Sequence, residues 1–180
     1  MEADHFHGSL NTIKPNDMII KRKRWVFTEE SPEIIKVSPE IILKRDKKPS
    51  IALIRLLSYF VDDIYKNISQ SVDYSIYFGG EKAGFIGLQR HDSGKDLYIA
   101  FIKTYKKYRG NHIATQVLQS IIKLAKETGF KKITLVTGDW TPAAVHIYEK
   151  LGFKIIKSTV IKENPDDPEY RNEFEMKLDL

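Results

Sequence analysis

The chain has 180 residues, a formal net charge of +5 and a hydrophobic fraction of 42%. This length fits a single domain, and the apolar fraction is high enough for a buried core, which excludes a chain that is disordered by composition. Because the sequence contains no cysteine, disulfides, thiolate metal sites and a cysteine nucleophile are also excluded.

The first 39 residues differ from the rest of the chain. They contain a basic cluster at residues 21–24 and two Ser-Pro pairs, which are turn signals. We expect an N-terminal extension over residues 1–39, with a strand at residues 18–27, followed by one regular domain over residues 40–180. The first ten residues lack the apolar segment of a secretory signal, and no apolar stretch is long enough to cross a bilayer. We therefore expect a cytoplasmic protein with no membrane partner.

The regular part begins with a short predicted strand and a helical segment. Residues 40–44 are typical of a strand, and residues 49–59 carry apolar side chains at helical spacing. Residues 61–68 predict one or two further helical turns.

A meander of three strands follows. Residues 74–78, 83–89 and 97–103 are predicted strands, separated by the tight turn 79–82 and by a second turn at 91–94. Strands joined by such short turns are expected to pair antiparallel.

The pattern then changes to a strand–helix–strand unit. Apolar residues between Ile113 and Ala125 share one helical face, and Gly129 stands where helices commonly end. Residues 133–137 form a β-branched strand, so the unit 97–137 predicts a right-handed crossover with parallel pairing.

A second helix and two strands complete the predicted elements. Thr141 is a suitable N-cap, Pro142 a suitable first residue, and Gly152 a suitable end of the helix. Residues 154–161 and 173–178 are the last two predicted strands, with an acidic loop between them.

The segment 103–114 joins a predicted strand to a predicted helix. Such a junction leaves backbone N–H groups at the helix N-terminus without intrahelical partners, and with the helix dipole they form an anion site suited to a phosphate. Gly110 permits a close approach of the backbone, and residues 103–109 carry four basic and no acidic side chains. Taken alone, the segment is equally typical of an ordinary solvated loop.

Tyr148 lies on the apolar stripe of the second predicted helix, where a tyrosine is commonly a core residue. Residues 108–114 (YRGNHIA) and 144–153 (AVHIYEKLGF) together resemble the GNAT acyltransferase family. The first is similar to the family's acyl-CoA loop, Gln/Arg-x-x-Gly-x-Gly/Ala, and the second to its helix Ala-Ile-x-Leu-Tyr-Glu-Lys-Leu-Gly-Phe. The resemblance covers about residues 40–180.

The resemblance implies a mixed α/β (α+β) fold: a mostly antiparallel central sheet of about six to seven strands, helices on both faces and one parallel strand–helix–strand unit. It also implies acetyl-CoA as cosubstrate, with its pyrophosphate on the backbone of residues 109–114 and its pantetheine at a strand end where parallel strands splay. The residues expected to contact acetyl-CoA are Ile102, Lys103, Thr104, Lys107, Arg109, Gly110, Asn111, His112, Ile113, Ala114, Thr141 and Tyr148.

Three positions depart from the family pattern. Lys107 replaces Gln or Arg, and Thr141 stands where the family often has Asn. His112 replaces Gly or Ala, so either the loop is displaced or the imidazole points outward.

The implied reaction is a direct attack of a primary amine on the thioester. An amine with a pKa of about 10.4 costs roughly 4–5 kcal/mol to deprotonate at pH 7, so a general base is useful. The candidates are Asp96 and Tyr98, which share one face of a predicted strand, and His91 in the preceding turn. Tyr148 is expected to donate a hydrogen bond to the leaving thiolate. No metal-ligand cluster is expected.

The acceptor is less defined. The acidic loop 163–173 would suit a cationic amine on a small molecule or a peptide. Two alternatives stay open: a non-catalytic domain that senses acyl-CoA or binds a partner, and an acyltransferase that acts on an amine carried by a nucleic acid such as a charged tRNA. Basic residues 21–24 and 103–109 suggest the second, although nucleic acid is the less favoured partner. A homodimer is a further expectation.

Overall fold

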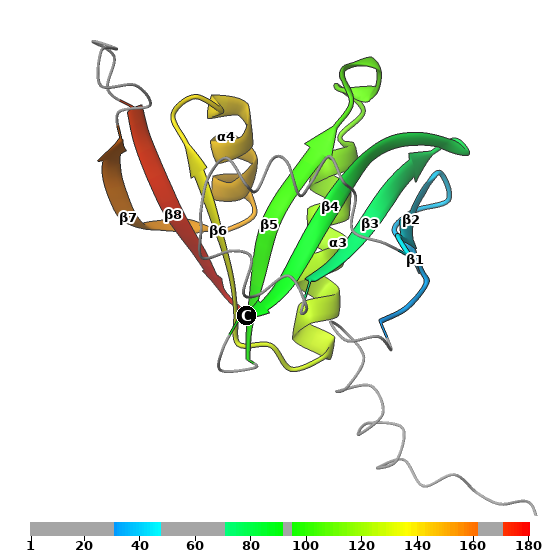
Figure 1. Ribbon diagram of the computed structural model, residues 1–180, viewed down its shortest axis with the longest axis horizontal. Coiled ribbons are helices and arrows are strands. Elements are labelled where there is room, and N and C mark those ends of the chain that lie inside the picture. The colour runs from blue at the N-terminus through cyan, green and yellow to red at the C-terminus, as the bar shows by residue number, and fades with distance from the viewer. Residues whose placement is uncertain (1–30, 48–70, 92–94, 162–170) are drawn as a thin grey trace, which may run out of the picture.

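The computed structural model describes residues 31–47, 71–91, 95–161 and 171–180 (Figure 1). The predicted strand at residues 18–27, the predicted helical segments at 49–68, the turn residues 92–94 and most of the acidic loop lie outside these residues.

The described strands form one eight-stranded sheet in the order β1-β2-β3-β4-β5-β6-β8-β7. Only β5 and β6 pair parallel, and the other neighbours pair antiparallel. The predicted fold class, a mostly antiparallel mixed sheet with one parallel strand–helix–strand unit, is confirmed, with eight strands rather than six to seven. The strands are β1 (Ile34–Lys36), β2 (Ile41–Arg45), β3 (Ser71–Phe78), β4 (Glu81–His91), β5 (Asp96–Thr104), β6 (Lys132–Gly138), β7 (Lys154–Ile161) and β8 (Arg171–Asp179).

The additional strand is β1, which lies inside the predicted N-terminal extension. It pairs with β2, and the carbonyl oxygen of Pro32 just before it accepts a hydrogen bond from the buried Tyr74 hydroxyl at 3.2 Å. The carbonyl oxygen of Ser31 likewise accepts one from Arg45 Nη1 at 2.8 Å. Residues 31–36 are therefore part of the sheet's packing.

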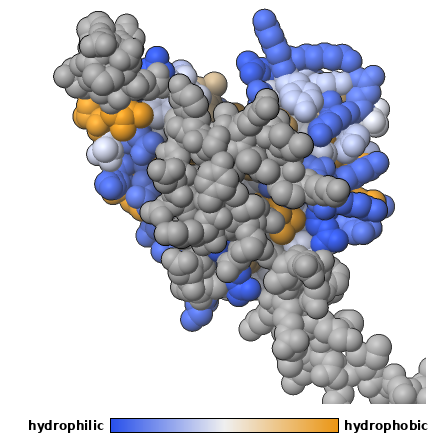
Figure 2. Space-filling model, in the orientation of Figure 1, coloured by the Kyte–Doolittle hydropathy of each residue, from blue (hydrophilic) through white to orange (hydrophobic). Residues whose placement is uncertain are grey.

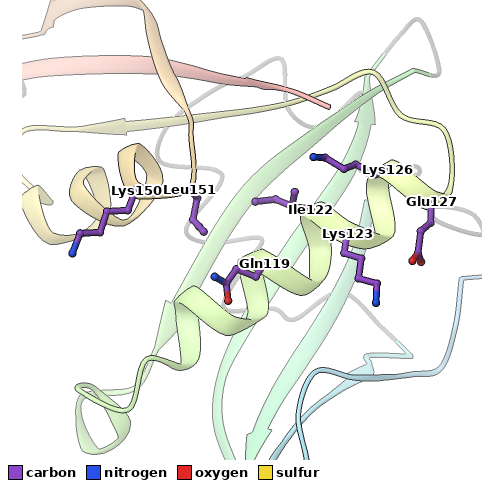
Figure 3. Close-up of a pocket in the computed structure, with 7 residues that line it drawn as sticks. All are labelled: Gln119, Ile122, Lys123, Lys126, Glu127, Lys150 and Leu151. Carbon is purple, nitrogen blue, oxygen red and sulfur yellow. The ribbon is translucent and has the colours of Figure 1, made fainter.

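Two helices lie within the described residues, α3 (Ile113–Glu127) and α4 (Pro142–Lys150). Gly129 and Gly152 follow them with φ of 84° and 92°, which are left-handed values that favour glycine, as the sequence predicts. Both helices border one groove and so cover the same face of the sheet (Figure 3). The side chains that α3 buries recur at helical spacing: Ile113, Val117, Leu118, Ile121 and Ala125.

The hairpin between β3 and β4 turns on two glycines. Gly79 and Gly80 have φ of 57° and 85°, which is the conformation of the two central residues of a type I′ turn. The predicted tight hairpin is confirmed.

An opening separates β5 from β6 at the end of the sheet that bears α4. Their parallel pairing stops at Ile99 and Leu135, after which β5 continues along β4 and β6 continues along β8. A β-bulge in β5 lies at the point of separation. Gly87 pairs with Phe101 while the next residue, Leu88, pairs with Ile99, so β5 has one extra residue between these pairs. Since a bulge bends its strand, it directs β5 away from β6 (Figure 1).

Candidate active site

The loop between β5 and α3 begins with a 3₁₀ turn, Lys106–Tyr108, and passes through Gly110. Gly110 has φ of 86°, and no atom lies within 4 Å of where its Cβ would be. Asn111 Nδ2 donates a hydrogen bond to the carbonyl oxygen of Tyr108 at 3.1 Å and so closes the loop on itself. The backbone at Gly110 is therefore open to a close approach from solvent.

His112 occupies a left-handed position at the start of α3. Its φ is 53°, and among the described residues no other non-glycine residue has a positive φ. The side chain is exposed and makes no capping hydrogen bond. Of the two arrangements expected for this departure from the family pattern, the structure therefore has the imidazole outward. A left-handed φ also explains why glycine suits this position.

The N-terminus of α3 keeps free donors. Its first intrahelical bond runs from Gln116 N to the carbonyl oxygen of His112 at 3.0 Å, so the N–H groups of Ile113, Ala114 and Thr115 have no intrahelical acceptor. No side chain caps them, and uncapped N–H groups at a helix N-terminus, together with the helix dipole, are suited to bind an anion such as phosphate.

The basic flank of this loop is partly anchored. Lys107 Nζ forms an ion pair with Glu81 Oε2 at 2.8 Å, and the Tyr108 hydroxyl donates to the same oxygen. Arg109 Nε donates to the carbonyl oxygen of Thr104 at 3.4 Å. The hydrogen bonds from Lys107 and Tyr108 lower the pKa of the exposed Glu81 carboxyl. Sequence reasoning did not identify Glu81 as the anchor of the loop, because its contact with Lys107 depends on the register of β4 against β5.

Hydrophilic side chains gather at the end of the molecule that carries this loop (Figure 2). Lys103 and Lys106 are both exposed there. Thr104 ends β5, and its Oγ1 is buried with no hydrogen-bond partner. Uncapped helix donors, exposed cations and an orphaned hydroxyl fit a bound group that carries phosphates and polar amides, which is the chemistry of the predicted cofactor.

Tyr148 lies on α4 and is 7% exposed. Its ring packs edge-on against Phe153, with ring centroids 5.7 Å apart. Burial, together with the electrostatic effect of Tyr98, raises the pKa of Tyr148 to about 12. Since such an effect requires proximity, the Tyr98 phenol on β5 lies near that of Tyr148, and Tyr98 stands one residue before the last β5–β6 pair, next to the opening.

Two carboxylates of β8 approach Tyr98. The pKa of the Tyr98 hydroxyl is raised, mainly by burial and to a lesser extent by the negative charges of Glu173 and Glu175. Glu173 and Glu175 pair in register with Gly138 and Val136, the part of β6 beyond its pairing with β5. Glu173 therefore lies on β8, in agreement with the predicted strand 173–178, although it was also counted with the acidic loop 163–173. Glu175 was not predicted, although the alternating acidic residues of β8 are a sequence signal for it.

Asp96, predicted to share a strand face with Tyr98, begins β5 two residues before it and so lies farther from the opening. Its Oδ2 is 3.1 Å from Lys132 Nζ, and the two residues are paired where β5 and β6 still run together. His91 is the last residue of β4. The structure thus brings Tyr98 near Tyr148, and leaves Asp96 in an ion pair away from the opening.

Thr141 occupies the N-cap position of α4, as predicted, but its side chain makes no capping hydrogen bond. Its hydroxyl lies 2.9 Å from Thr137 Oγ1 and donates to the carbonyl oxygen of Gly138 at 3.1 Å. The Trp140 ring covers Gly138, where a Cβ would lie 2.1 Å from the ring. These contacts fix the end of β6 beside the opening.

A separate groove of about 530 Å³ lies between α3 and α4 (Figure 3). Ile122 and Leu151 line it, with Lys123, Lys126 and Lys150 around them. These residues come from the C-terminal half of α3 and the C-terminal end of α4. The groove is therefore distinct from the loop at the α3 N-terminus.

Within the described parts of the chain, no three His, Asp or Glu residues are grouped as a metal site would need. In those same parts, neither helix has the length and apolar character required to cross a bilayer.

The comparisons with known proteins agree with this arrangement. The model of the acetyltransferase (GNAT) family matches residues 45–153, which is more than half of the chain. The chain therefore belongs to the GNAT acetyltransferase family.

Individual relatives match shorter segments. A probable N-acetyltransferase camello of Xenopus tropicalis is 33% identical over 76 residues, 42% of this chain and 35% of that protein. An N-alpha-acetyltransferase 30 of Schizosaccharomyces pombe is 41% identical over 56 residues, 31% of this chain and 37% of that protein. Each match thus spans little more than a third of the relative's length.

Among solved structures, a GNAT family acetyltransferase of Elizabethkingia anophelis with acetyl-CoA bound superposes with a TM-score of 0.62. The match covers 79% of this chain and 100% of that one at 20% identity, which establishes a common fold.

Proposed function

We propose that this protein is an N-acetyltransferase that moves an acetyl group from acetyl-CoA to a primary amine by direct attack. The observation that carries the proposal is the opening between β5 and β6, where Tyr148 lies near Tyr98 and the field of Glu173 and Glu175 reaches Tyr98. Membership of the family and the uncapped N-terminus of α3 beside this opening support it.

The cofactor supplies an activated acetyl group as a thioester. In the proposal, the N–H groups of Ile113, Ala114 and Thr115 bind its pyrophosphate, and the backbone at Gly110 lies against the same group. The buried Thr104 hydroxyl at the end of β5 forms a hydrogen bond with the pantetheine arm, which satisfies an atom that otherwise has no partner.

Tyr148 acts in the proposal as a hydrogen-bond donor. With a pKa of about 12, it keeps its proton at neutral pH. A thiol with a pKa near 8.5 is roughly 3–4 units more acidic, so full proton transfer from Tyr148 to a thiolate is uphill by about 5 kcal/mol. A donor held in place by burial instead stabilises charge as it develops on the sulfur.

We assign the amine's proton to the carboxylates of β8 rather than to Tyr98 or Asp96. The raised pKa of Tyr98 leaves its hydroxyl protonated at neutral pH, and Asp96 is held by Lys132. Glu173 and Glu175 are half-buried beside the opening, where they attract a cationic amine and accept its proton directly or through water. The acceptor is therefore a cationic amine on a small molecule or a peptide, and the proposal retains a cytoplasmic location.

Binding of acetyl-CoA tests the cofactor site. At a concentration 100 times its Kd, acetyl-CoA is expected to add about 2.7 kcal/mol to the free energy of unfolding, measured as a thermal shift. Gly110→Asp is expected to abolish this shift, because its carboxylate repels the phosphates. Gly80→Asp is the matched control, since Gly80 has nearly the same φ and equal space but lies in the β3–β4 turn. No shift in the native protein, or equal shifts in both variants, would contradict the proposed site.

A further inference from the structure

Asp73, on β3, is a buried carboxylate without hydrogen-bond partners. The residue is 7% exposed, and neither Oδ1 nor Oδ2 has a partner. A carboxylate removed from water is costly unless it is paired, so proteins rarely keep one in this state without a role. The proposed chemistry at Tyr148 does not use it.

A second carboxylate lies beside Asp73. Asp46 follows β2, its backbone N–H donates to the carbonyl oxygen of Asp73 at 2.9 Å, and its Oδ1 accepts a hydrogen bond from Ser75 Oγ at 2.7 Å. Burial and the charge of Asp46 raise the pKa of Asp73 to about 6. The site therefore has an excess of negative charge at neutral pH.

The other described groups on this face do not neutralise that charge. Lys44 of β2 pairs in register with Ser75, but its Nζ lies over the Tyr77 ring, 4.6 Å from the centroid. β4 contributes Gly87 opposite Asp73 and the uncharged Gln89. Lys103 of β5, which pairs with Phe85 opposite Ser75, shares this face but is exposed and lies two strands away from Asp73.

The Asp73 side chain shares a face of the sheet with Phe101 of β5, which lies next to the opening. Asp73 pairs with Gly87, and Gly87 pairs with Phe101, which follows the last β5–β6 pair. A Cβ on Gly87 would lie 2.0 Å from the Phe101 ring, so that ring occupies the face toward which a side chain at Gly87 would point. Directly paired residues share a face, so Asp73 lies beyond the ring on that side. The separation of β3 from β5 is two strand spacings, about 10 Å.

We propose that Asp73 and Asp46 bind a second cationic group of the acceptor. The acceptor is then a primary amine that carries an ammonium or guanidinium group roughly 12 Å from the reacting nitrogen, because the opening beyond β5 is about two and a half strand spacings from β3. Its connecting methylenes pass over the Phe101 ring, and the distant cation gives the two unpartnered oxygens of Asp73 their donors. This inference rests on the proposed acetyl transfer.

The test compares two amines. Spermidine has further cationic groups at a distance from its reacting amine, whereas n-octylamine has a single amine and no second cationic group. Asp73→Asn keeps the shape of the side chain and removes its charge. We expect the KM for spermidine to rise about 10–100-fold in this variant, the loss of a charge-assisted hydrogen bond, with the KM for n-octylamine and for acetyl-CoA unchanged. Asp46→Asn is expected to act in the same direction. Glu40→Gln, which removes an exposed carboxylate at the turn before β2, is the control and is expected to change neither KM.

The outcomes separate this inference from the proposed function. If both amines are acetylated and Asp73→Asn leaves the KM for spermidine unchanged, the inference is overturned and the acetyl transfer stands. If neither amine is acetylated, the proposed function fails for these acceptors, and calorimetry of spermidine binding decides the inference. Binding that weakens below pH 6 and is lost in Asp73→Asn supports it, whereas equal binding by both proteins, or no binding to the native protein, overturns it.

Discussion

At the scale of single residues, removal of the Tyr148 hydroxyl distinguishes a catalytic role of this residue from a packing role. Tyr148→Phe retains the ring and its contact with Phe153. If the hydroxyl stabilises the leaving thiolate, turnover falls about 10²–10³-fold while the affinity for acetyl-CoA changes little. Steady-state turnover and calorimetric binding of acetyl-CoA give both quantities.

The pH profile adds a second readout for Tyr148. Because its pKa is raised to about 12, the hydroxyl keeps its proton through neutral and mildly alkaline pH. The variant is therefore expected to scale the rate without moving the limbs of the profile below about pH 10. Full turnover, with a loss of about 1 kcal/mol in the free energy of unfolding, would identify a core tyrosine only.

The buried Asp73 carboxyl leads to a prediction about how the free energy of unfolding depends on pH. Its pKa rises from 3.8 to about 6 on folding, so the folded state disfavours the ionised form. This cost is absent below pH 3.8, grows as the pH rises, and is complete above about pH 6. Asp73→Asn is expected to raise the free energy of unfolding by about 3 kcal/mol at pH 7 and by almost nothing at pH 4, measured by urea unfolding. A variant less stable than the native protein at pH 7 would mean that the ionised carboxylate has a partner.

The residues of the candidate sites differed in how far the sequence could predict them. Tyr148 and Gly110 stand in motifs whose residue types reflect local chemistry, so the sequence alone singled them out. Asp73 and Glu175 were not identified, because their importance depends on which strand lies beside them. Asp96 was predicted correctly to share a face with Tyr98, but the paired end of β5 holds it in an ion pair with Lys132.

At the scale of elements, β1 is the strand that the sequence pattern did not reveal. It has three residues, and the Ser-Pro pairs on either side indicated only turns. It pairs with β2 across a short turn, but a strand of three residues is too short to show a clear alternation of apolar and polar side chains. By contrast, the β3–β4 hairpin, the ends of α3 and α4 and the strand–helix–strand unit follow from glycine positions and periodicity, and they appear as predicted.

Removal of β1 tests its contribution. A fragment of residues 40–180 loses the β1–β2 ladder and leaves the buried Tyr74 hydroxyl without its acceptor at Pro32. We expect it to be less stable than a fragment of residues 31–180 by at least about 1–3 kcal/mol, the cost of one unsatisfied buried group. Acetyl-CoA is expected to bind both fragments, because the loop and α3 lie far along the chain from the cut.

The two fragments are compared by thermal unfolding and by acetyl-CoA titration. Equal stability would show that β1 contributes nothing to the sheet. A well-folded 40–180 fragment that fails to bind acetyl-CoA would assign the N-terminal extension a part in the cofactor site.

At the scale of the whole molecule, the candidate site depends on two features of the sheet. The bulge in β5 parts it from β6, and the continued pairing of β6 with β8 carries Glu173 and Glu175 to the same opening. The sequence predicted that parallel strands would splay here through its family resemblance. The bulge itself could not be predicted, because it is a mismatch between β4 and β5 and is not a property of either strand.

The most direct test of the central claim is the amine-dependent release of free thiol from acetyl-CoA by the purified chain, with mass spectrometry of the acceptor. The panel includes spermidine, n-octylamine and peptides with free amines. We predict one acetylated nitrogen for each thiol released, and a rate about 10²–10³-fold lower in Tyr148→Phe. Acetyl-CoA binding without thiol release for any amine, or release at an equal rate in Tyr148→Phe, would contradict the account.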